Sequence, residues 1–167
     1  MKSYKLLLWL VFSLALAPGE SKDKLSQDLS KYHALFIGKF IDYIDWPDPG
    51  QLTIGVVGNS RVMIELQSTI EKRGKARVKK IAGVADISDC DLLFIPASQS
   101  KLFTTLNQAS DNKPVLIVTE EESLAFQGAG ISFYVEGGKL KFIINKSAVE
   151  SRNLKVSSNL IGLAKVI

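Results

Sequence analysis

Apolar residues near the start of the chain form a single short run, at residues 6–17, that only Ser13 interrupts. This run follows a basic start and is about 12 residues long, whereas a helix that crosses a bilayer needs about 20. A basic start, a short apolar stretch and small residues after it are typical of a secretory signal peptide. We therefore expect a signal peptide at residues 1–21, which would export the protein from the cytosol. An uncleaved membrane anchor is the alternative.

The next segment, residues 24–44, has apolar positions three and four residues apart, which is the spacing of one face of a helix. The positions on this stripe are Leu25, Leu29, Tyr32, Phe36, Phe40 and Tyr43. The helix should end at residues 45–50, because proline removes a backbone donor and restricts the residue before it.

Short continuous apolar segments then alternate with helical ones. Buried parallel strands are predicted at residues 52–58, 76–81, 92–96 and 115–118. Helices are predicted at residues 61–72, capped by Asn59 or Ser60, and at residues 101–109, capped by Ser98 or Ser100. This alternation indicates right-handed βαβ units and a mostly parallel sheet.

Residues 131–144 change to period-two alternation on either side of Gly137 and Gly138, which predicts an antiparallel hairpin. A short helix at residues 146–153 and an apolar stretch at residues 160–167 follow. The predicted fold is therefore α/β, with a mostly parallel sheet from βαβ units flanked by helices and a C-terminal antiparallel hairpin. No linker interrupts the pattern, so we expect residues 22–167 to form a single domain.

Composition and charge argue against several classes of function. The net charge is +4, but the basic residues are interspersed with acidic ones, so no nucleic-acid groove is expected. One cysteine cannot form an intramolecular disulfide, and one histidine cannot build a metal site by itself. The acidic clusters at residues 86–91 and 120–122 show neither a calcium-loop pattern nor a nucleophile and base. The second is expected to be a solvated loop or the first turn of a helix. We predict no metal, no cofactor and no enzymatic activity.

Cys90 and His33 are the remaining side chains with distinctive chemistry. Cys90 lies between Asp89 and Asp91, whose charges raise the pKa of a thiol and suppress the reactive thiolate. A structural cysteine is the leading interpretation, and an intermolecular disulfide or redox contact is the alternative. His33 lies beside the helical stripe, and we expect it to be a half-buried packing residue.

Four residues are candidates for a partner interface. Trp46 directly precedes a proline, and it either closes the end of the first helix against the sheet or is exposed and anchors a partner. Lys139, Lys141 and Ile143 form the row of the hairpin that we expect to point outward.

Six segments of the chain, taken in order, resemble the YfiR family of periplasmic proteins. They are residues 32–47 (YHALFIGKFIDYIDWP), 52–58 (LTIGVVG), 90–95 (CDLLFI), 114–118 (PVLIV), 128–133 (GAGISF) and 139–164. The resemblance implies an exported α/β domain that is often dimeric. The best-known type of member restrains a membrane-bound diguanylate cyclase by binding its periplasmic sensor domain, which limits cyclic di-GMP and biofilm formation. Cys90 matches a family position, but the further cysteines that allow internal disulfides are absent, so redox control is not implied here.

The leading hypothesis is thus a periplasmic regulatory protein that binds and restrains a membrane-bound sensor, a diguanylate cyclase. The alternative is a periplasmic module that binds a small ligand and has no cyclase partner. Its pocket would lie at the carboxyl ends of the parallel strands, near Gly58 and Ala97.

Overall fold

The computed structural model describes residues 19–48 and 50–167. The predicted signal peptide lies outside these residues, apart from its last three positions, which belong to the first helix. None of the helices in the described part of the chain combines the length and the apolar character needed to span a lipid bilayer.

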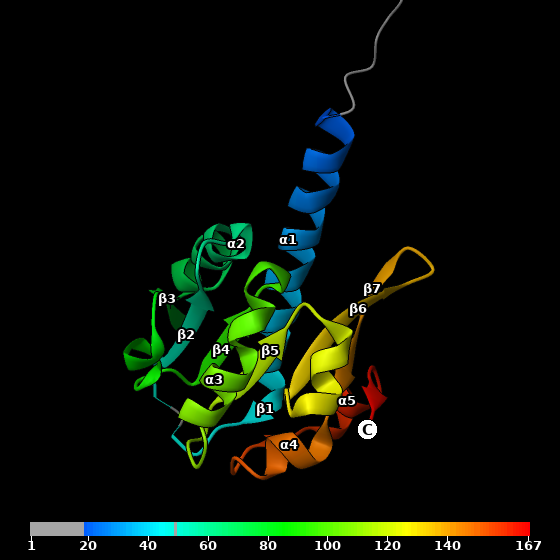
Figure 1. The fold of residues 1–167 in the computed structure, drawn as a ribbon. Helices are drawn as coiled ribbons and strands as arrows, with labels where there is room; N and C mark the ends of the chain where they lie inside the picture. The colour runs from blue at the N-terminus through cyan, green and yellow to red at the C-terminus, as the bar shows by residue number, and fades with distance from the viewer. Residues whose placement is uncertain (1–18, 49) are drawn as a thin grey trace, which may run out of the picture.

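A sheet that is parallel except for one hairpin organises this part of the chain (Figure 1). Its strands are β2 (Leu52–Val57), β3 (Ala76–Ile81), β4 (Leu92–Ile95), β5 (Leu116–Thr119), β6 (Ile131–Glu136), β7 (Lys139–Ile144) and β9 (Lys165–Val166). They lie in the order β3-β2-β4-β5-β6-β7-β9, and β6 with β7 is the antiparallel pair. The predicted α/β fold with a C-terminal hairpin is confirmed.

Helices cover both faces of this sheet (Figure 1). One face packs against α1 (Gly19–Tyr43), α2 (Arg61–Thr69), α4 (Lys146–Glu150) and α5 (Ser158–Ile161). The other face packs against α3 (Phe103–Ala109) and the 3₁₀ turns η2 (Val84–Ile87) and η4 (Glu122–Gln127). The remaining elements are η1 (Glu71–Arg73), η3 (Ala97–Leu102) and the short antiparallel pair β1 (Ile44–Asp45) and β8 (Lys155–Val156).

The core on the α1 face is centred on phenylalanine rings. Phe40 of α1 lies 5.2 Å from Phe142 of β7 and 5.7 Å from Phe133 of β6, measured between ring centroids. Rings at these separations add about 0.5–1.5 kcal/mol per pair to the burial of their apolar surface. They fix α1 across the strands that carry the hairpin.

The hairpin turn follows directly from its two glycines. Glu136 pairs with Lys139, which leaves Gly137 and Gly138 as a two-residue turn with φ of 58° and 72°. A type I′ turn needs a left-handed conformation at both positions, and glycine adopts it without a steric penalty.

Three of the predicted helices differ from those observed. The helix predicted at residues 61–72 ends at Thr69 and is followed by η1, and the one predicted at residues 146–153 ends at Glu150. The helix predicted at residues 101–109 begins as η3 at Ala97, directly after Pro96, and no serine side chain caps it. Ser60 does cap α2 as expected, because its side chain accepts a hydrogen bond from the Val62 N–H.

Candidate functional site

The carboxyl ends of β2, β4 and β5 open into a cavity of about 420 Å³. Its walls come from α1, from the turns that follow β2, β4 and β5, and from the hairpin. Asn59 and Ala97 line it, so the structure has a cavity at the place where the sequence suggests one. Ligands of open α/β sheets commonly bind at this edge.

The floor of this cavity holds a buried pair of titratable side chains, His33 of α1 and Glu120. His33 Nδ1 lies 3.1 Å from Glu120 Oε1, and the two side chains are 9% and 22% exposed. His33 Nδ1 has no other hydrogen-bond partner among the described residues. The imidazole packs against Phe133, with 4.6 Å between ring centroids. His33 is therefore more deeply buried than expected.

Glu120 also links the cavity to the turn after β4. Its Oε2 accepts a hydrogen bond of 2.9 Å from the Ala97 N–H. Burial by itself would raise the pKa of this carboxyl, but the contacts with His33 and Ala97 outweigh burial and hold the pKa below its usual value. Glu122 opens η4, as the expected first turn of a helix, whereas Glu120 is largely buried and not solvated.

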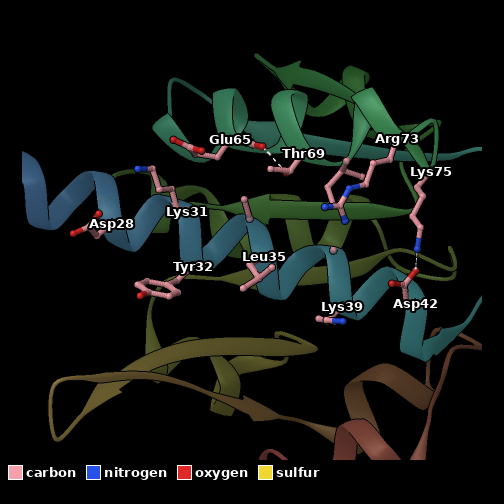
Figure 2. Close-up of a pocket in the computed structure, with 13 residues that line it drawn as sticks. Asp28, Lys31, Tyr32, Leu35, Lys39, Asp42, Glu65, Thr69, Arg73 and Lys75 are labelled. Carbon is pink, nitrogen blue, oxygen red and sulfur yellow. Dashed lines mark hydrogen bonds and ion pairs between the residues drawn. The ribbon is translucent and has the colours of Figure 1, made fainter.

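A second hollow, of about 480 Å³, lies between α1 and α2 (Figure 2). Tyr32, Leu35 and Lys39 line it from α1, whereas Glu65 and Arg73 line it from the α2 side. Its α1 wall is partly apolar and exposed to solvent, since Tyr32 is 55% exposed and Leu35 is 59% exposed.

The stripe predicted for the first helix coincides only in part with the buried face: Phe40 is fully buried and Phe36 packs against the core. The buried positions of α1 include Ala34, Ile37 and Ile41, whereas Tyr32 and Tyr43 of the predicted stripe are exposed. This difference arises because α1 carries apolar residues on two faces, and only one of them can pack on the sheet.

Trp46 packs partly against the core at the end of α1. Its Nε1–H donates a hydrogen bond of 3.1 Å to the carbonyl oxygen of Ile41, and its ring contacts the buried cluster on the α1 face. This geometry favours the interpretation that Trp46 closes the end of the helix.

The hairpin row does not point outward along its whole length. Lys139 and Lys141 are exposed, and Lys141 forms an ion pair with Glu136. Ile143, in contrast, is fully buried, so its prediction as an outward residue is wrong. The physical reason is that η4 packs on β6 and β7 and covers this end of the hairpin.

Cys90 lies in the core on the α3 face and is 5% exposed. Its Sγ is 3.7 Å from the carbonyl oxygen of Asp86, and burial is the main reason why the pKa of the thiol rises to about 11. This environment favours a structural role, because an intermolecular disulfide or redox contact would require the sulfur to reach solvent. His33, on the α1 face, is not near it.

The sequence did not reveal the pairing of His33 with Glu120 or the exposure of Leu35. The available signal for Leu35 was its position off the predicted stripe, on a helix face that also carries Lys31 and Lys39. No group of three or more histidine, cysteine, aspartate or glutamate residues that could hold a metal ion occurs in the part of the chain that the structure describes.

Comparisons with known proteins show which fold and which family this chain resembles. One solved structure that is similar is that of the ABC domain in complex with L-Trp from Streptococcus pneumonia, with a TM-score of 0.64 and 16% sequence identity. The match covers 78% of this chain and 59% of that chain, and at this identity it shows the fold alone. No curated protein matches this chain. The model of the DUF4154 family, described as YfiR/HmsC-like, matches residues 30–165, which include almost all of the described domain. The chain therefore belongs to the YfiR/HmsC-like family.

Proposed function

We propose that this protein is an exported, periplasmic regulator that binds and restrains a membrane-bound sensor, a diguanylate cyclase, through the sensor's periplasmic part. The observation that carries this proposal is the family match over residues 30–165. Residues 22–167 form the regulatory domain, and residues 1–21 are the leader that directs its export.

The mechanism requires only that the protein bind one conformation of the sensor more tightly than the other. Such binding shifts the population of the sensor without any chemical step in the regulator. A change in activity of fivefold to a hundredfold needs about 1–3 kcal/mol of differential binding. The exposed apolar side chains of α1, Tyr32 and Leu35, are suited to contacts of this kind.

Deletion of the gene tests the proposal. Cellular cyclic di-GMP and biofilm formation should rise, and a plasmid copy that retains residues 1–21 should restore both to their original level. A copy that lacks residues 1–21 should not restore them, although it accumulates to the same amount. Unchanged cyclic di-GMP after deletion would refute the proposal.

A second candidate function is favoured by the cavity at the carboxyl ends of the strands, where His33 and Glu120 lie beside Phe133. A small ligand bound there would make the protein a sensory module without a cyclase partner. In a thermal-shift screen, a ligand present at about 100 times its Kd adds about 2.7 kcal/mol to stability. The exposed residue Ser98 lines the cavity, so Ser98→Trp should abolish that shift and leave the Tm of the free protein unchanged. A screen of periplasmic metabolites without any such shift would argue against this candidate.

A further inference from the structure

We propose that the outward face of α1 and the hollow between α1 and α2 receive an amphipathic helix of the membrane sensor, with a carboxylate at the end of the helix that lies near η1. This inference rests on the proposed function and names the surface through which the partner is held.

The first argument is that α1 is apolar on two opposite faces. Phe40 and Ile37 of its inner face are completely buried. The outer face still presents Tyr32 at 55% exposure and Leu35 at 59%, and Leu163 after α5 lies beside it at 74%. Large apolar side chains that are grouped on an exposed face with polar residues around them commonly mark an interaction site. The outer face therefore has the character of a surface that a partner covers.

The second argument is the shape of this face. Hollows of about 480 Å³ and 270 Å³ flank the ridge that Leu35 forms, one toward α2 and one toward α5. The α1 and α2 helices approach closely at Gly38, where a Cβ would lie only 2.6 Å from Ile70 Cδ1. This close approach makes a continuous floor for the larger hollow. An amphipathic helix bound to such a groove anchors its apolar side chains at intervals of three and four residues.

The third argument is charge, which gives the bound helix a direction. Lys39 and Arg73 border the η1 end of the hollow, and no salt bridge among the described residues involves either of them. Lys75 at the same end is already paired with Asp42, 2.5 Å away. The opposite end carries the acidic residue Asp28. The C-terminal end of a helix, or a carboxylate on it, fits the basic end best.

The same charges disfavour a second copy of this chain as the occupant. Two α1 helices that cross antiparallel at Leu35 would place Lys39 of one copy opposite Lys31 of the other. A parallel crossing would place Lys39 opposite Lys39. Like charges facing each other across an interface act against that pairing.

Site-specific photocrosslinking in cells tests the surface directly. A photoreactive phenylalanine analogue at position 35 should crosslink to a periplasmic segment of a membrane sensor, and mass spectrometry should locate the adduct on a helix that carries an acidic residue. The control is the same analogue at Val135, which is 60% exposed on the hairpin. The proposal is overturned if position 35 gives no adduct, if it gives only a second copy of this chain, or if the sensor is captured from position 135 alone.

Charge reversal supplies an independent readout. The double variant Lys39→Glu/Arg73→Glu should reduce the crosslink from position 35 about tenfold and raise cyclic di-GMP as deletion does. Lys101→Glu/Lys155→Glu makes the same change in net charge on exposed lysines elsewhere, and it should leave both readouts unchanged. Circular dichroism and Tm confirm that each variant is folded.

These results separate the surface from the function. If deletion raises cyclic di-GMP but the Lys39→Glu/Arg73→Glu variant restrains the cyclase normally, the surface is wrong and the regulatory function stands. If deletion leaves cyclic di-GMP unchanged but position 35 captures an acidic helix of another membrane sensor, the surface stands and the cyclase assignment fails.

Discussion

Replacing Glu120 by glutamine should destabilise the protein in a pH-dependent manner. The carboxylate accepts a 2.9 Å hydrogen bond from the Ala97 N–H and lies 3.1 Å from His33 Nδ1, with its side chain only 22% exposed. Glutamine has the same shape and keeps an oxygen for the Ala97 N–H, so the variant removes the charge while leaving the packing in place.

The expected magnitude follows from these two contacts. A hydrogen bond to a charged group contributes about 1.5–3 kcal/mol and a neutral one about 0.5–1.5 kcal/mol, so the Ala97 bond should weaken by about 1 kcal/mol. Loss of the contact with His33, 3.1 Å away, adds to this cost. Relief from the cost of burying a carboxylate offsets most of that second contribution. We expect Glu120→Gln to lower the free energy of unfolding by about 1–2 kcal/mol at about pH 5.5.

The sign of the pH dependence is fixed by the direction of the pKa shift. The pKa of Glu120 in the folded protein lies below its ordinary value of 4.5. The stabilisation from its charge is therefore complete above the pKa of the unfolded chain, and it is lost as the pH falls through the lower pKa of the folded state. The difference in free energy of unfolding between wild type and Glu120→Gln should shrink below about pH 4.5. It should approach zero once the Glu120 carboxyl is protonated, because residue 120 is then neutral in both proteins.

Urea unfolding at several pH values between about 5.5 and 3 measures this difference through the midpoint and slope. Glu122→Gln is the matched control, because Glu122 is about half exposed and its ion pair with Lys165 has a separation of 3.9 Å. Its effect should stay within about 0.5 kcal/mol. Equal stability of the two variants at pH 5.5, or a Glu120→Gln effect that persists unchanged at pH 3, would refute the reasoning.

Three further predictions concern other buried contacts. Cys90 has a pKa of about 11 in the folded protein, whereas an unfolded cysteine has a pKa of about 8.5. At pH 8 it should therefore react with a disulfide reagent at least a hundredfold more slowly in the folded protein than in urea. Comparable rates in the two states would contradict this. Arg152 donates hydrogen bonds to the Ser110 carbonyl and to Asn107 Oδ1 at the end of α3, so Arg152→Met should cost about 3 kcal/mol in urea unfolding. Arg152→Lys should recover only part of this loss, because lysine lacks the planar fork. Trp46→Phe removes the indole N–H bond to Ile41 and should lower the free energy of unfolding by about 1 kcal/mol, whereas a variant as stable as wild type would place Trp46 outside the packed end of α1.

Local sequence patterns determined the elements and their order. The continuous apolar segments at β2, β4 and β5 and the alternation around Gly137 and Gly138 are short-range features, and they predict strands and a hairpin turn without knowledge of the rest of the chain. Alternation of strands with helices then leaves a mostly parallel sheet as the natural arrangement. Where local signals competed, as in the cap of the helix after β4, the turn formed by Pro96 prevailed over the serines.

Only the tertiary structure decided which surfaces meet. α1 has apolar residues on two faces, and its packing against Phe133 and Phe142 selected the inner one and left Leu35 exposed. Ile143 is buried because η4 packs over the hairpin. The period-two alternation that suggested an exposed Ile143 lies in residues 131–144 and contains no information about η4. His33 and Glu120 are far apart in sequence, and the fold alone brings them within 3.1 Å. Periodicity along a chain reports how each segment can be buried, whereas contacts between segments depend on three-dimensional packing that no local pattern contains.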